Sequence, residues 1–400
     1  MLGEHVDGWD RLVARSPEEH TRRGIDVRIR TKVTAIDLEA REVHWRERDG
    51  GRDGVEAYDF LALTTGAHDL RPDLPGLDLG FPVFTPRQAM RLGDALPPVQ
   101  RALIVGGGYI GMEMAEAMRD RGAAVTLINR SERLLHRTFD PDMSERVAAA
   151  AREIGIELEL GAAATSIAGQ DGGCTVTTER GSFAGDIAIL GLGSAPSVDL
   201  AREAGVPLGE TGAIAVDHAQ RTSIPGVYAA GDCAEAWDLI AERWRNLHLG
   251  TIANKAGRVA GLNIGAESLA QQPMQTLPGV AGTTILRLGS HEISRTGLTM
   301  AEAGEAGIDV RAETIEGRQI AGYMPGSSPI HVKLIAETGS GRVVGGQIIG
   351  QQGAGKRIDV VATAVSLGLT VQQLVDLDLA YAPPFSGAWD PVQTAGRVLL

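Results

Sequence analysis

Residues 106–111 form the clearest chemical pattern in this 400-residue chain, because GGGYIG fits G-x-G-x-x-G. In such a pattern Gly106 permits a tight turn, Gly108 lets backbone approach a pyrophosphate, and Gly111 lets a helix pack closely on a strand. The N-terminus of that helix offers N–H groups and positive dipole to an anion. The pattern predicts a dinucleotide site formed by Gly106, Gly108, Tyr109, Ile110 and Gly111. A glycine turn without a ligand is the alternative.

The residues after the next predicted strand bear on which dinucleotide binds. A ribose acceptor is expected about 20 residues beyond the first glycine, and Asn129 stands 23 residues beyond it. No acid is present there to accept the 2′-OH of NAD, whereas Arg130, with Arg133 behind it, can meet a 2′-phosphate. We therefore expect NADPH, or use of both dinucleotides, with a solvated surface Arg130 as the alternative.

The two cysteines, Cys174 and Cys233, are expected to be structural. A catalytic thiol needs an electropositive and accessible setting, but Cys233 follows Asp232 directly and Cys174 begins a predicted strand. Two cysteines also make no disulfide framework, which suits a reducing cytoplasm. The histidines predict no metal site, because they are widely separated: His248, His291 and His331.

The elements that must position these residues alternate between strands and helices, which predicts an α/β fold. A strand over 101–105, a helix over 109–120 and a strand over 125–128 surround the glycine pattern. The elements predicted before them are a short helix over 16–24, strands over 25–29, 33–37 and 42–46, and an apolar strand over 58–67. Those predicted after them are strands within 155–188, a helix over about 249–264, and alternating strands and helices to the end.

The composition excludes several classes of function. A net charge of −13 and only 4 % aromatic residues argue against a nucleic-acid partner, which requires a basic face. No apolar run reaches the roughly 18 residues of a membrane span, and residues 1–5 do not resemble a signal peptide. We expect a cytoplasmic protein that binds neither nucleic acid nor membrane.

With these features placed, the chain resembles the pyridine nucleotide-disulfide oxidoreductases. More narrowly it is similar to the branch of coenzyme A-disulfide reductases, NADH oxidases and persulfide reductases. The motifs that carry the resemblance are TTGA over 64–67, GGGYIGMEMAE over 106–116, GSAP over 193–196, TSIPGVYAAGDCAE over 222–235, KRIDV over 356–360 and YAPPFSGAWDPV over 381–392.

The resemblance implies two Rossmann-like nucleotide-binding domains, the first incomplete, and a C-terminal α+β dimerisation domain. Residues 1–82 and 213–268 would form the FAD-binding domain, 83–212 the NAD(P)-binding domain, and 275–400 the dimerisation domain of a homodimer. The implied cofactors are FAD and NAD(P)H. The residues that match the family at its cofactor sites are Val33, Thr65, Gly66, Ala67, Gly193, Gly231, Asp232 and Ala234.

Among these, Asp232 resembles the acid that accepts a hydrogen bond from the ribityl chain of the flavin, and the backbone of Val33 lies where the family touches the adenine. Tyr109 resembles a gate tyrosine over the nicotinamide. Glu113 resembles a helix glutamate near that ring.

Two further residues, Tyr323 and Tyr381, match tyrosines that reach across the dimer in the coenzyme A-disulfide reductases. A phenol in that position can give a proton to a leaving thiolate. Packing in a Pro- and Gly-rich segment is the alternative for each.

One departure from the family concerns the start of the chain. Members begin with a strand, a first glycine fingerprint for FAD, and a helix with the redox cysteine. About 40 residues of that kind, on the usual βαβ size, are expected upstream of this sequence. We therefore expect the first βα unit and the redox cysteine to be absent, and disulfide reductase activity of the 400 residues to be weak or nil.

The main hypothesis is an FAD-dependent NAD(P)H oxidoreductase that reduces a disulfide, a persulfide or oxygen, the substrate being a small thiol compound such as coenzyme A. One alternative is a non-catalytic dimeric NAD(P)-binding module. Another is an NAD(P)H oxidase that reduces oxygen at the flavin.

Overall fold

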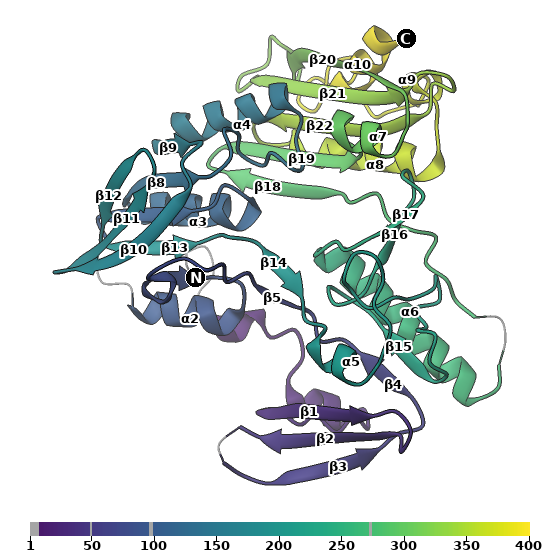
Figure 1. Ribbon diagram of the computed structural model, residues 1–400. Helices are drawn as coiled ribbons and strands as arrows, with labels where there is room; N and C mark the ends of the chain where they lie inside the picture. The colour runs from purple at the N-terminus through teal and green to yellow at the C-terminus, as the bar shows by residue number, and fades with distance from the viewer. Residues whose placement is uncertain (1–7, 49, 96–98, 272–273) are drawn as a thin grey trace.

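The computed structural model describes residues 8–48, 50–95, 99–271 and 274–400. Its larger sheets lie in three regions of Figure 1: the parallel sheet at the left, an antiparallel sheet at the top right, and a small antiparallel layer at the bottom. In the described part of the chain, every helix is too short or too polar to cross a membrane.

The parallel sheet holds the glycine pattern. Its strand order is β6 (Phe81–Pro82), β13 (Ile187–Leu190), β7 (Arg101–Val105), β8 (Ala124–Asn129) and β9 (Ile156–Leu160). Helix α3 (Tyr109–Asp120) follows β7, and α4 (Pro141–Glu153) connects β8 to β9; α2 (Pro86–Ala95) follows β6. The strand and the helix predicted around the pattern are confirmed. They form because β7 is a short apolar run, as a strand buried on both faces requires.

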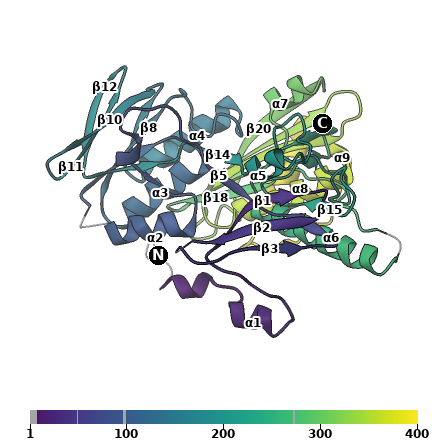
Figure 2. The ribbon, with the colours of Figure 1, turned by 60° about the horizontal axis from the view of Figure 1, so that its bottom comes forward.

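A second, antiparallel layer extends from this sheet. It consists of β10 (Ala164–Gln170), β11 (Gly173–Thr178) and β12 (Gly181–Gly185). Figures 1 and 2 both place it at the end of the molecule farthest from α9 (Val371–Val375).

The lower part of the molecule is built from small sheets. Strands β1 (Thr31–Asp37), β2 (Glu42–Glu47) and β3 (Asp53–Ala57) form an antiparallel layer. Three strand pairs lie above it: β4 (Leu61–Leu63) with β15 (Val227–Ala229), β5 (Ala67–Asp69) with β14 (Ser194–Pro196), and β16 (Ala236–Asp238) with β17 (Arg243–Arg245). The helices here are α1 (Pro17–Thr21), α5 (Asp199–Glu203) and α6 (Gly250–Ser268).

Two predictions in this part were wrong in detail. Residues 25–29 form no strand, because Ile25 and Ile29 are exposed and Arg30 takes a left-handed backbone (φ 58°) that breaks the extended run. The strand expected over 58–67 is divided into β4 and β5. The helix predicted over about 249–264 is confirmed as α6, and the hairpin β16–β17 lies between it and the Gly231–Asp232 turn.

The C-terminal part is a five-stranded antiparallel sheet. Its order is β18 (Thr284–Leu288), β19 (His291–Gly297), β22 (Val343–Gly350), β21 (Pro329–Glu337) and β20 (Val310–Arg318). The helices are α7 (Met300–Glu305), α8 (Ile358–Leu367), α9 and α10 (Pro391–Leu399). Helix α10 begins where Asp390 accepts a bond from the Val392 N–H and Pro391 occupies the first helical position.

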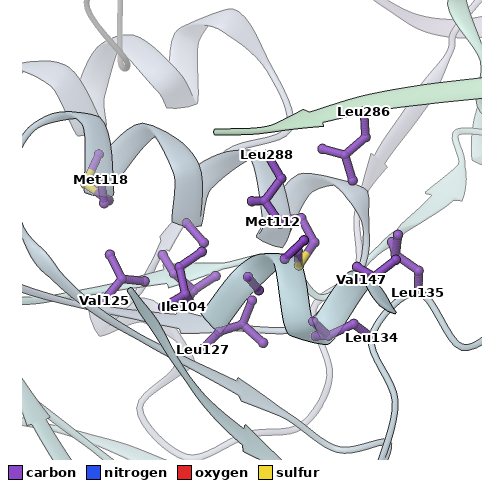
Figure 3. Close-up of a cluster of buried hydrophobic side chains, with 14 of the residues drawn as sticks. Ile104, Met112, Met118, Val125, Leu127, Leu134, Leu135, Val147, Leu286 and Leu288 are labelled. Atoms are coloured by element: carbon purple, nitrogen blue, oxygen red, sulfur yellow. The ribbon is translucent and has the colours of Figure 1, made fainter. Parts of the chain in front are cut away.

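The parallel sheet and the C-terminal sheet share one hydrophobic core. Leu286 and Leu288 of β18 pack in the same buried cluster as Met112 of α3 and Leu127 of β8 (Figure 3). Lys333 of β21 adds ion pairs to the buried Asp140 at 3.4 Å and to the partly exposed Asp142 of α4 at 2.6 Å. Helix α3 is therefore held between its own sheet and β18, which fixes the glycine turn at its N-terminus.

Candidate functional site

The turn between β7 and α3 needs glycine at two positions for its own geometry. Gly106 has φ 112°, and a Cβ there would lie 2.3 Å from the carbonyl oxygen of Gly191. A Cβ on Gly111 would lie 1.8 Å from the carbonyl oxygen of Gly106. Both contacts are with backbone, so neither glycine can be replaced without moving the turn.

Gly108 differs, because nothing in the chain requires it to be glycine. Its φ is −86°, which any residue adopts, and a Cβ there would meet no atom within 4 Å. It is also the N-cap of α3, where no side chain caps the helix. At Gly108, backbone without a side chain faces open space at a helix N-terminus, where a diphosphate could bind. We call this space the Gly108 cradle.

The side chain of Asn129 holds this turn and is not free for a ribose. Its Oδ1 accepts from the Gly107 N–H at 3.0 Å, and its amide donates to the carbonyls of Ser131 and Arg133 at 2.9 and 3.1 Å. The residue is buried. Asn129 was predicted to contact the cofactor, but its side chain instead stabilises the turn between β7 and α3.

Basic side chains gather beside that turn. Partial burial first, and then the positive charges of Arg137, Arg133 and Arg130, lower the pKa of His136. Because each of the three charges acts on His136, the three arginines lie near the same imidazole. Arg130 is exposed, so its guanidinium is available to an anion.

Tyr109 and Glu113 follow on the first turns of α3. The Tyr109 hydroxyl lies 2.6 Å from Thr284 Oγ1 of β18, and burial raises the pKa of this phenol. Glu113 is open to solvent on one side, yet partial burial first and the Glu116 carboxylate second raise its pKa. Ile110 is half-buried between them.

A second group of predicted residues lies between the end of β4 and the start of β5, beside the end of β14. Thr65 donates through Oγ1 to the Ser197 carbonyl at 2.6 Å, and the Gly66 carbonyl accepts from the Ser197 N–H at 2.9 Å. Ala67 pairs with Pro196 across the β5–β14 ladder. The structure therefore places Thr65, Gly66 and Ala67 beside the strand that Gly193 precedes.

The turn from Gly231 to Ala234 is linked to the same strand by side chains. Ser194 Oγ lies 2.5 Å from His248 Nδ1, and His248 Nε2 lies 2.7 Å from Asn246 Oδ1. The Asn246 amide in turn donates to the carbonyls of Asp232 and Ala234 at 2.9 and 3.2 Å. Sequence reasoning missed Asn246 and His248, because no local spacing relates them to Asp232.

The tautomer of His248 follows from these contacts. Asn246 uses its amide on two carbonyls, so its Oδ1 must accept from His248 Nε2. Burial lowers the pKa of His248, although Asp232 opposes the effect. A neutral His248 then accepts through Nδ1 from the Ser194 hydroxyl.

Asp232 itself keeps its carboxylate available. It is half-buried, and within the described chain no group donates a hydrogen bond to its side chain. A carboxylate without a donor in the protein can accept a hydrogen bond from a ligand hydroxyl. The residues present therefore fit a flavin ribityl chain at Asp232, as Gly108 fits a diphosphate.

Neither cysteine lies in a setting for redox chemistry. Cys233 is fully buried and its Sγ lies 3.5 Å from the Leu63 carbonyl and 3.4 Å from that of Ala230. Cys174 is buried in β11, where burial first and Asp186 second raise the pKa of the thiol. In the part of the chain that the structure describes, no His, Cys, Asp and Glu side chains cluster as metal ligands.

The remaining candidates lie apart from these turns. Val33 is exposed on β1, in the layer at the bottom of Figure 1. Tyr323 and Tyr381 lie on loops of the C-terminal part, exposed by 76 % and 54 %. Those two loops contact each other, since the Ala321 N–H donates to the Pro383 carbonyl at 3.0 Å.

A parallel sheet with an open glycine turn at a helix N-terminus, and a second turn with an available carboxylate, are typical of dinucleotide-binding proteins. Residues 5–257 match the family described as pyridine nucleotide-disulphide oxidoreductase, and residues 287–392 match its dimerisation domain. The chain belongs to this family. FAD and NAD(P)H are accordingly its cofactors.

Relatives with stated activities match over nearly the whole chain. A CoA-dependent NAD(P)H sulfur oxidoreductase of Pyrococcus furiosus is 36 % identical over 99 % of this chain and 88 % of its own length. The structure of a NAD-dependent persulfide reductase from A. fulgidus has a TM-score of 0.92 and 32 % identity, covering 99 % of this chain and 74 % of that one. An engineered water-forming NADPH oxidase, a mutant of the Lactobacillus brevis NADH oxidase, has a TM-score of 0.93 and 27 % identity over 99 % and 87 %.

Proposed function

We propose that this protein is an FAD-dependent NAD(P)H reductase whose acceptor is a disulfide or persulfide of the coenzyme A type. The observation that carries the proposal is the 36 % identity to a CoA-dependent sulfur oxidoreductase over 99 % of the chain. Bound NAD(P)H supplies the hydride, and FAD carries its two electrons onward. Residues 83–212 would bind NAD(P). Residues 1–82 and 213–268 would bind FAD, and residues 275–400 would bind a second copy of the chain.

The Gly108 cradle would hold the dinucleotide diphosphate, with Gly106 and Gly111 fixing its shape and Tyr109 and Ile110 bordering it. Arg130 and Arg133 would select NADPH by meeting its 2′-phosphate. The engineered NADPH oxidase supports this, because its substitutions include an aspartate changed to alanine and the next alanine changed to arginine. Asn129 followed by Arg130 makes the same combination of no acid and one guanidinium.

The flavin site would take its contacts from the second group of turns. Asp232 would accept a hydrogen bond from the ribityl chain, with Gly231 and Ala234 shaping its turn. Thr65, Gly66, Ala67 and Gly193 would border the nucleotide, and the backbone of Val33 would face the adenine. Glu113 would lie near the nicotinamide, and partial burial raises the pKa of this carboxyl above its ordinary value.

Tyr323 and Tyr381 would act at the sulfur substrate bound by a partner subunit. Their exposure on connected loops supports this, since a buried phenol could not reach another chain. Each hydroxyl would hold a proton for the thiolate that leaves when the sulfur–sulfur bond is reduced.

A second candidate is an NAD(P)H oxidase that delivers electrons to oxygen. The burial of Cys174 and Cys233 favours it, because neither thiol can exchange with a disulfide. Oxygen requires no thiol.

The test compares three acceptors with one protein. Purified protein is saturated with FAD and given NADPH with coenzyme A disulfide or coenzyme A persulfide under anaerobic conditions, or with oxygen alone. The proposal expects thiol or sulfide release to exceed oxygen consumption, although the release should be slow because Cys174 and Cys233 are buried. NADPH oxidation with oxygen only would establish the second candidate, and no oxidation with any acceptor would overturn both.

A further inference from the structure

Arg357 lies between the two tyrosine loops, and its side chain points into the protein. Its neighbour Lys356 is 74 % exposed and pairs with Asp359 at the surface, whereas the Arg357 side chain is only 13 % exposed. Two adjacent cations of one motif therefore have different environments. The Arg357 side chain is largely shielded from solvent.

The guanidinium of Arg357 makes four hydrogen bonds to four separate points of the chain. Nε donates to Asp390 Oδ2 at 3.0 Å and Nη1 to the Gly353 carbonyl at 2.7 Å. Nη2 donates to the carbonyls of Gln319 and Phe385, both at 2.6 Å. Four of the five N–H donors of the group are thus used.

Three of these acceptors, in Gln319, Phe385 and Asp390, belong to the loops that carry the tyrosines. The loop over 319–328 begins at Gln319 and holds Tyr323; the loop over 381–390 holds Tyr381 and Phe385 and ends at Asp390. Both tyrosine rings are mainly exposed, so burial of these two side chains does not fix where the rings lie. The hydrogen bonds of Arg357 and the Ala321–Pro383 backbone bond join the two loops to each other.

We propose that Arg357 is a positioning residue that holds the loops over 319–328 and 381–390 as one unit, so that Tyr323 and Tyr381 reach the sulfur substrate together. The inference rests on the proposed function of the two tyrosines. Lysine cannot replace arginine here, because a single ammonium cannot span four acceptors lying in different directions.

Hydrogen–deuterium exchange of the FAD-loaded dimer tests the connection directly. In Arg357→Met, amides of both loops should exchange about tenfold faster than in the wild type, because charge-assisted bonds are lost from both. Arg357→Lys keeps the charge and should fall between the two. Lys356→Met, which removes the same charge one residue away, should leave both loops as in the wild type.

Kinetics with coenzyme A disulfide test the consequence for the reaction. In Arg357→Met the KM for the disulfide should rise about tenfold, while the KM for NADPH stays within about twofold. Added guanidinium should recover part of the loss. Such a KM split and rescue would not follow from general destabilisation.

The inference is overturned if Arg357→Met or Arg357→Lys leaves the exchange of both loops unchanged, or accelerates one loop alone. It is also overturned if the KM for NADPH rises as much as that for the disulfide. If wild-type protein does not reduce coenzyme A disulfide, the proposed function fails, and the exchange data alone decide whether Arg357 connects the loops.

Discussion

Replacing Gly108 by alanine should weaken dinucleotide binding while leaving the stability of the fold nearly unchanged. The added Cβ would meet no protein atom within 4 Å and requires no unusual backbone, since φ is −86°. Alanine is a slightly poorer N-cap than glycine, so we expect a loss of at most about 1 kcal/mol in the free energy of unfolding.

The cost to dinucleotide binding should be larger. A methyl group in the cradle keeps the diphosphate away from the backbone N–H groups at the start of α3. One hydrogen bond to a charged group contributes about 1.5–3 kcal/mol. Its loss corresponds to a KM for NADPH about ten- to a hundredfold higher.

The assay is steady-state NADPH oxidation, with Kd for NADPH from titration of the protein and Tm from calorimetry. Gly111→Ala is the matched comparison, because its Cβ would lie 1.8 Å from the Gly106 carbonyl oxygen. It should lower Tm strongly, whereas Gly108→Ala should not. An unchanged KM and Kd in Gly108→Ala would refute the placement of the diphosphate at this turn.

Three further predictions follow from the contacts described above. Replacing Arg130 and Arg133 by glutamine should raise the KM for NADPH about five- to tenfold and that for NADH less than twofold, as measured by the ratio of the two kcat/KM values. Lys333→Met should lower the free energy of unfolding by about 2–4 kcal/mol in urea titrations, because it leaves Asp142 and the fully buried Asp140 without their cation. His248 has a lowered pKa in the folded chain, so the unfolded chain binds more protons just below pH 6.5 and stability should fall as pH drops through that range. His248→Gln should flatten that slope by at most about 1.4 kcal/mol per pH unit.

The sequence was sufficient to predict an element where its hydrophobic pattern leads into glycines that the backbone geometry requires. The strand over 101–105 and the helix over 109–120 were predicted at the bounds that the structure has, because an apolar run leads into glycines that only this turn needs. The turn at Gly231 and Asp232 was found through the family motif over 222–235.

Contacts between distant segments were beyond such reasoning. The run over 25–29 alternates like a strand, but no neighbouring strand covers Ile25 or Ile29. His248 was treated as a single histidine, although its ring joins Ser194, 54 residues earlier, to Asn246. Only the folded chain brings these groups within hydrogen-bond distance.

Asn129 shows how a residue can occupy a recognition position and serve the fold instead. An aspartate there could accept from the Gly107 N–H but could not donate to the carbonyls of Ser131 and Arg133, which the asparagine amide does. The turn proposed to hold the diphosphate and the loop that carries Arg133 therefore depend on one amide. Because that amide is already engaged, we expect discrimination between the dinucleotides to come from Arg130 and Arg133.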